Sequence, residues 1–174
     1  MADVALIVVA VDSLWRRQGH IPPADRTALQ LAALDGLPLV LVTSADEAAL
    51  REVAWMLRMD PIGVVGPTRR TELRGRLLSE SQTAESVLDR LAEELSRAPL
   101  PFSRRDILAI GGDESAAEWL AAAGLSAWVA STPGETPCDY LTPDGLAQAV
   151  GELAMRNNRF LRPGAGAGQT FRRL

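Results

Sequence analysis

Polar side chains that could do chemistry follow three apolar runs of the sequence. They are Asp12, then Thr43 with Ser44, and finally Asp113, which the glycine pair Gly111-Gly112 precedes. A carboxylate can act as nucleophile or general acid and base, and a hydroxyl can orient a substrate oxygen. The same residue types also cap helices and loops, so a purely structural role stays open for each of them.

The elements that must position these side chains alternate between strands and helices. Apolar runs rich in β-branched residues predict buried strands at 4–11, 38–42, 62–65, 107–110 and 126–130. Apolar residues at helical spacing predict helices over 24–34, 46–59, 83–96, 114–123 and 143–155. This alternation predicts an α/β fold: a single doubly wound, Rossmann-like domain with a mainly parallel five-stranded sheet and helices on both faces. Its site is expected beyond the carboxyl ends of the strands, where the polar residues lie.

Composition excludes several kinds of mechanism and partner. The 174 residues include one cysteine and one histidine, which excludes a disulfide framework and a structural zinc site within one chain. All 18 basic residues are arginine, so no lysine can form a Schiff base or clamp a phosphate. A net charge of −4 argues against a nucleic-acid partner, and the apolar run near the N-terminus is too short for a membrane span. We therefore expect a cytoplasmic protein in which Cys138 is a structural thiol.

Composition changes near the C-terminus. We expect an α/β domain over 1–155 and an Arg/Gly-rich tail over 156–174, which holds five arginines and no acidic residue. The tail is either disordered or binds a protein partner or a second copy of the chain. Apolar residues beside arginines are common at interfaces. The expected partner-binding residues are Arg159, Phe160, Leu161, Arg162, Phe171, Arg172, Arg173 and Leu174.

Two further segments carry expectations. Residues 68–81 are polar and predict an exposed loop or a hairpin centred on Gly75. Trp15 follows the first strand in a predicted loop, and we expect it at a contact surface.

The order of the strand-end residues resembles the haloacid dehalogenase (HAD) superfamily, and within it the Cof-like sugar-phosphate phosphatases. That family's first strand ends in D-x-D-G-T, and here residues 10–14 are Ala-Val-Asp-Ser-Leu, with Ile-Pro-Pro at 21–23. Its second motif, a Thr or Ser that ends a strand, is similar to Thr43-Ser44. Its fourth motif, G-D-x-x-N-D, aligns with 111–116, and a closing D-G-V segment aligns with 144–146. The resemblance spans about residues 1–155.

The resemblance implies phosphoryl transfer through an aspartyl-phosphate with Mg²⁺, yet several reactive groups differ. Ala10 stands where the family has its nucleophile, Gln82 where it has a cation, and Gly112 where it has a metal-binding aspartate. Ala116 replaces the last aspartate of the fourth motif, whereas Asp12 and Thr43 match the family's acid/base and hydroxyl. The implied pocket is degenerate and consists of Ala10, Asp12, Thr43, Ser44, Gln82, Gly112 and Asp113.

Three functions follow from this comparison. The first is a catalytically inactive, pseudophosphatase domain that needs no cofactor and acts as a protein-binding, assembly or regulatory subunit. The alternative is a Mg²⁺-dependent phosphatase in which Asp12 attacks and Asp113 or Glu114 holds the metal, with an arginine such as Arg105 as the missing cation. A second alternative is a sensor that binds a phosphate or nucleotide at residues 111–115. Where Cof-like enzymes insert a cap domain this chain has only residues 68–81, and capless relatives act on large substrates or use a neighbouring subunit as the lid.

Overall fold

One mixed sheet runs through the computed structural model, which describes residues 4–15, 19–79, 83–96, 101–130, 132, 134–157 and 172–173. Within these residues its strands lie in the order β5-β4-β3-β2-β1-β6-β7-β8-β9. Their bounds are β1 Leu6–Ala10, β2 Leu39–Val42, β3 Gly63–Val65, β4 Thr71–Leu73, β5 Arg76–Ser79, β6 Ile107–Gly111, β7 Leu125–Trp128, β8 Tyr140–Leu141 and β9 Arg172–Arg173.

The parallel part of the sheet is one strand wider than predicted. The five predicted strands correspond to β1, β2, β3, β6 and β7, and β8 pairs in parallel with β7 as a sixth. A strand of two residues leaves no apolar run, so periodicity could not reveal it. Residues 71–79 form the expected hairpin: β4 and β5 pair antiparallel around Arg74 and Gly75, both at positive φ, as a tight hairpin turn requires.

The predicted helices are present, with small shifts at their ends. They are α2 Pro23–Leu34, α3 Glu47–Leu57, α4 Ala84–Leu95, α5 Ala117–Ala122 and α6 Leu146–Asn157. A 3₁₀ turn, η2 Glu114–Ala116, takes the first part of the predicted helix 114–123, and a second one, η1 Arg104–Asp106, precedes β6. The four-residue α1, Val11–Leu14, was not predicted, because one helical turn is too short to show a period.

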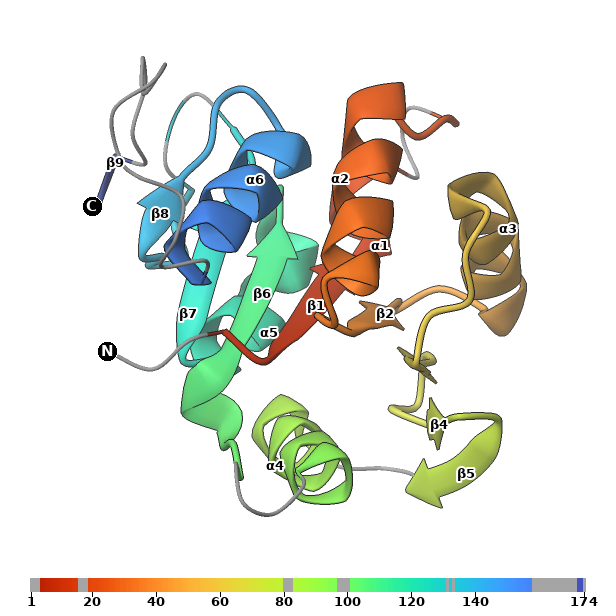
Figure 1. The fold of residues 1–174 in the computed structure, drawn as a ribbon. Coiled ribbons are helices and arrows are strands. Elements are labelled where there is room, and N and C mark those ends of the chain that lie inside the picture. Colours follow the sequence, from red (N-terminus) through yellow and green to blue (C-terminus); the bar gives the residue numbers. More distant parts are fainter. Residues whose placement is uncertain are drawn as a thin grey trace.

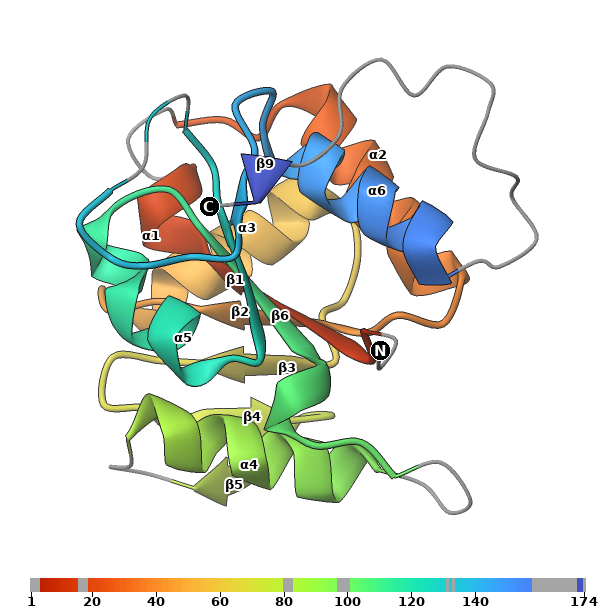
Figure 2. The same cartoon turned by 90° about the vertical axis from the view of Figure 1, so that its left-hand side faces the viewer.

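Helices cover both faces of the sheet (Figures 1 and 2), which confirms the doubly wound α/β class. The side chains of α2, α3 and α6 share one apolar cluster, and those of α4 and α5 share the other. Strand β1 contributes to both, since Ile7 and Val9 face the first cluster whereas Val8 and Ala10 face the second. This alternation makes the central strand apolar throughout.

Trp15 is not at a surface, so that expectation was wrong. Its side chain is 2% exposed, because the turn of α1 directs it into the cluster beneath α2 and α6. There the indole N–H donates to Asp25 at 3.2 Å, and the same carboxylate accepts the backbone N–H of Ala147 at 3.1 Å. The exposed tryptophan is Trp55 on α3, at 80%.

The structure describes little of the predicted tail. Arg172 and Arg173 form β9, which pairs antiparallel with β8. The other expected partner-binding residues, Arg159, Phe160, Leu161, Arg162, Phe171 and Leu174, lie outside the described residues. Among the helices that are described, none is both long and apolar enough to cross a bilayer.

Candidate functional site

The carboxyl ends of β1, β2 and β6 meet at one edge of the sheet. β1 lies between β2 and β6 and is parallel to both, so Asp12, Thr43 and Gly112 follow the ends of adjacent strands. This is the edge at which doubly wound sheets bind their ligands.

Asp12 is held to the end of β2 by hydrogen bonds. The Thr43 hydroxyl lies 2.8 and 2.9 Å from its two carboxylate oxygens. The backbone N–H of Ser44 donates to Oδ2 at 2.7 Å, and the Ser44 hydroxyl does so at 3.0 Å. Hydrogen bonds to an ionised carboxylate are stronger than neutral ones. The Asp12 carboxylate therefore links the turn after β1 to the end of β2. Asp12, Thr43 and Ser44 lie together, as the sequence predicted.

Ser13, which sequence reasoning did not single out, fastens the same turn to the other neighbour. Its hydroxyl donates to the carbonyl of Ala10 at 2.8 Å and accepts the backbone N–H of Gly112 at 2.9 Å. The available signal was its place in the first motif, where Ser13 stands at the family's glycine. Asp12 and Ser13 together tie the end of β1 to β2 on one side and to β6 on the other.

The positions that would carry the family's missing carboxylates are closed. Ala10 is 5% exposed and packs in the cluster beneath α4 and α5, and Ala116 is fully buried. A Cβ on Gly112 would lie 2.9 Å from the carbonyl oxygen of Ser13 and 3.3 Å from that of Val129. An aspartate at 112 would therefore require the backbone of α1 to move.

Asp113 and Glu114 both hold local backbone. Asp113 Oδ1 accepts the N–H of Ser115 at 2.9 Å and so caps η2. Glu114 accepts the N–H groups of Glu135 and Thr136 at 2.9 and 3.3 Å, and also the Thr136 hydroxyl. These hydrogen bonds, that of the hydroxyl above all, lower the pKa of Glu114 despite its desolvation and the nearby Asp113. Glu114 thus fixes the loop between β7 and β8 beside the end of β6.

Arg105, which the phosphatase hypothesis used to replace the missing cation, does not lie at this edge of the sheet. Arg105 lies in η1 before β6, at the opposite end of that strand, so it cannot serve the site. Gln82 lies outside the described residues. Arg69, in the turn after β3, forms an ion pair with Glu118 of α5.

Asp12 and Asp113 are the carboxylates of this edge that the sequence proposed as magnesium ligands. Mg²⁺ is usually bound by one or two carboxylates together with waters and substrate phosphates. In this structure the Asp12 oxygens accept hydrogen bonds from Thr43 and Ser44, and Asp113 caps its own turn. Within the described part of the chain no three His, Cys, Asp or Glu side chains are grouped closely enough to hold a metal. The pocket beside Asp12 is only about 100 Å³, between α1 and α3.

Cys138 is half-buried and packs beside the α4/α5 cluster. Burial, and then the negative charge of Asp139, raise the pKa of its thiol, opposed by a backbone hydrogen bond at Trp128. A raised pKa keeps the sulfur protonated at neutral pH, which suits the structural role expected for it.

No protein-family model and no curated protein sequence matches the chain, but solved structures do. The 3-deoxy-D-manno-octulosonate 8-phosphate phosphatase of Moraxella catarrhalis, solved with magnesium and phosphate ions, has a TM-score of 0.63 at 16% identity, over 90% of this chain and 89% of its own. The cobalt-bound deoxy-D-mannose-octulosonate 8-phosphate phosphatase of Haemophilus influenzae has a TM-score of 0.57 at 14% identity, over 92% of this chain and 94% of its own. A HAD-superfamily phosphatase from Bacteroides thetaiotaomicron gives 0.63 at 12%, over 87% and 96%. The fold is therefore HAD-like.

Proposed function

We propose that this chain is a HAD-like domain without phosphatase activity, which acts by binding another protein or a second copy of itself. The observation that carries the proposal is Ala10, a buried methyl group at the position of the family's nucleophile. No atom of alanine can attack phosphorus.

The surroundings of Ala10 support the proposal. Removing one member of a catalytic unit abolishes most of its rate, because the members act together. Here Asp12 is engaged with Thr43 and Ser44, and the backbone of Ser13 closes the metal aspartate's position at Gly112. The hairpin β4–β5 extends the sheet rather than building a lid, which fits a domain that meets large partners.

Hydrolysis of p-nitrophenyl phosphate with millimolar Mg²⁺ tests whether the chain lacks phosphatase activity. We expect no release of p-nitrophenol above buffer from the wild-type chain, nor from Ala10→Asp, because Gly112 and Ala116 still lack carboxylates. Circular dichroism of each variant shows that it is folded. Turnover by the wild type that disappears in Asp12→Asn would show that the domain is an enzyme.

A second candidate is a Mg²⁺-dependent phosphatase in which Asp12 attacks, and the similarity to phosphatases solved with magnesium or cobalt favours it. It would require Asp12 to leave Thr43 and Ser44 before reacting. Beryllofluoride mimics an aspartyl-phosphate, so a bound ¹⁹F NMR signal with Mg²⁺ that Asp12→Asn abolishes would support this candidate. For the phosphate sensor, the structure offers less: Asp113 already accepts the Ser115 N–H at the expected site.

A further inference from the structure

An apolar groove lies between helices α2 and α6, which are side by side on one face of the sheet (Figures 1 and 2). Its volume is about 570 Å³, and ligand sites commonly have about 300–1,000 Å³. The start of α6 lies beside the start of α2, where the backbone N–H of Ala147 donates to Asp25 at 3.1 Å. Further along, Gly151 and Leu31 line the same groove, so the two helices run in the same direction.

The groove leaves apolar surface open to solvent. The side chain of Leu31 is 55% exposed, and that of Leu34 on the next turn of α2 is 82% exposed. The opposite wall is low, because a Cβ on Gly151 would meet no atom within 4 Å. Asp35 lines one end of the groove, and its carboxylate forms no hydrogen bond or ion pair with the described residues. The groove therefore suits an apolar group that has a positive charge next to it.

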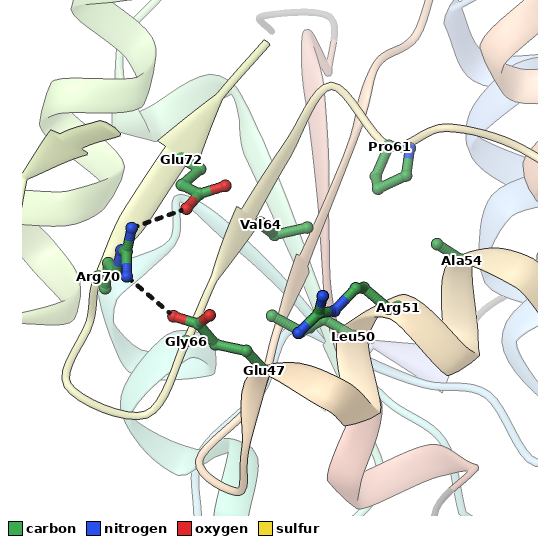
Figure 3. A pocket seen from close by; sticks show the side chains of 9 residues that line it. All are labelled: Glu47, Leu50, Arg51, Ala54, Pro61, Val64, Gly66, Arg70 and Glu72. Carbon is green, nitrogen blue, oxygen red and sulfur yellow. Dashed lines mark ion pairs between the residues drawn. The ribbon is translucent and has the colours of Figure 1, made fainter. Parts of the chain in front are cut away.

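The pocket between α3 and the strands β3 and β4 has no such preference (Figure 3). Arg51, Arg70, Glu47 and Glu72 all line it, so its formal charges balance. Arg70 lies 3.6 Å from Glu47 and 3.3 Å from Glu72, and the pairing is complete within the domain. We therefore assign no ligand to this pocket.

The chain itself contains a segment with the chemistry that the groove requires. Residues 159–162, which lie outside the described part of the chain, are Arg-Phe-Leu-Arg, two large apolar residues between two arginines. The tail 156–174 holds five of the 18 arginines and none of the 22 acidic residues, so the rest of the chain is acidic overall. Opposite charges on the tail and the domain favour their contact.

The tail of the same copy is too short to fill the groove with these residues. Helix α6 ends at Asn157, which is six residues and about 9 Å beyond Gly151 along the helix axis. The chain must then reverse its direction, and a tight turn takes about two residues. Up to Leu161 this leaves two residues, which span at most about 7 Å. The groove at Gly151 is therefore within reach of a second copy but not of the same chain.

We propose that Phe160 and Leu161 of one copy bind the groove between α2 and α6 of a second copy, with a neighbouring arginine beside Asp35. In a two-fold symmetric dimer this contact forms twice, since each copy supplies one tail and one groove. The inference rests on the proposed function and names the surface to which the tail binds. It involves neither Ala10 nor Asp12.

Light scattering of the full-length chain tests the groove. We expect the wild type to be a dimer and Ala28→Phe to raise the dissociation constant of the dimer at least about tenfold, because the new ring fills the groove. Asp35→Asn should raise it about fivefold through the loss of one ion pair. Ala48→Phe adds the same bulk to an exposed position of α3 and should remain dimeric. Circular dichroism shows that each variant is folded.

A mixture of two variants tests the exchange between copies. Ala28→Phe keeps its tail, and the double variant Phe160→Ser, Leu161→Ser keeps its groove, so one of the two contacts can form between them. We expect the mixture to have a greater mean mass than either variant alone at the same total concentration. A mixture that gains no mass would contradict the exchange.

The remaining outcomes separate this inference from the proposed function. A wild-type dimer that persists in folded Ala28→Phe refutes the groove, whereas its loss in the double variant would still support a binding role of the tail. A wild type that is monomeric, or that purifies with a different protein, refutes the second copy as the occupant. Hydrolysis of p-nitrophenyl phosphate by the wild type would refute the proposed absence of activity and leave the mass measurements as they are.

Discussion

At the scale of single residues, Asp12 shows how one carboxylate can join the ends of two neighbouring strands. In the resemblance to HAD phosphatases it would serve as acid and base. In this structure it accepts from Thr43 and Ser44, and Ser13 completes the link to Gly112. The turn after β1 is consequently a structural joint between three strands. Ala10 carries our proposal of an inactive domain, and the contacts of Asp12 show how that carboxylate is held in this structure.

We expect Asp12→Asn to lower the free energy of unfolding by about 1.5 kcal/mol, because the hydrogen bonds to Thr43 and Ser44 lose their charge. Urea denaturation followed by circular dichroism measures this. The matched control is Asp60→Asn, at an exposed position after α3, which should change stability by less than about 0.5 kcal/mol. Equal stabilities of the two variants would contradict a structural role for Asp12.

At the scale of elements, close backbone contacts decide where glycine is required. Gly124 precedes β7, and a Cβ there would lie 2.2 Å from the carbonyl oxygen of Arg105. Gly151 lies in the exposed face of α6, where a Cβ would meet nothing within 4 Å. The same substitution is therefore expected to act in opposite directions at the two sites.

Gly124→Ala should destabilise the domain by about 2 kcal/mol or more, because the backbone of η1 and β7 must separate. Gly151→Ala should stabilise it by about 0.5–1 kcal/mol through helix propensity. Thermal unfolding of both variants beside the wild type gives the comparison. A loss of stability in Gly151→Ala, or none in Gly124→Ala, would mean that the packing of these elements is different.

The loop between β7 and β8 should loosen in acid. The pKa of Glu114 is lowered by its hydrogen bonds to Thr136 and Glu135, so its contribution to stability is present at neutral pH. It is lost as the pH falls through that lowered value, when Glu114 becomes protonated. Hydrogen exchange of the Glu135 and Thr136 amides, corrected for intrinsic rates, should accelerate in that range.

Glu114→Gln should show the fast exchange already at pH 7 and little change on acidification. Glu93→Gln, at an exposed site on α4, is the control and should behave as the wild type. If Glu114→Gln retains slow exchange at neutral pH, the carboxylate does not hold the loop.

At the scale of the whole molecule, the ends of the sheet differ. The hairpin β4–β5 forms one edge, and the short β8 and β9 form the other, so part of the arginine-rich segment joins the domain. Under our proposal, the remaining tail residues provide the contact with a partner or a second copy.

A chain ending at Asn157 keeps α6 and removes β9 and the tail. We expect the full chain to have the greater mass by light scattering, as a homo-oligomer or with its co-purified partner, and the shortened chain to be monomeric. The full-length double variant Phe160→Ser, Leu161→Ser should also lose the complex, since it removes apolar anchors and keeps the charge. Identical masses for all three chains would contradict a binding role for the tail.

Much of this fold could be predicted because its information is local. The apolar run ending at Val11 predicts a buried strand, and the helical spacing of Leu50, Val53 and Leu57 predicts a helix with one buried face. Each pattern lies within its own element, so it can be recognised without knowing which elements pack against it. Strand β8 and helix α1 were not predicted, because elements of two and four residues are too short to show a hydrophobic period. Trp15 was misplaced because a single helical turn, fixed by contacts distant in sequence, sets the direction of its side chain.

The sequence alone determined that position 10 is alanine and position 112 is glycine. Neither side chain has an oxygen atom, whatever the fold. The tertiary structure decided which residues meet. Asp12 is hydrogen-bonded to Thr43, the Ser13 carbonyl lies against Gly112, and Arg51 and Arg70 line one pocket. Such contacts join residues between about twenty and a hundred positions apart. They exist only because parallel pairing brings separate strand ends and helices to common edges of one sheet.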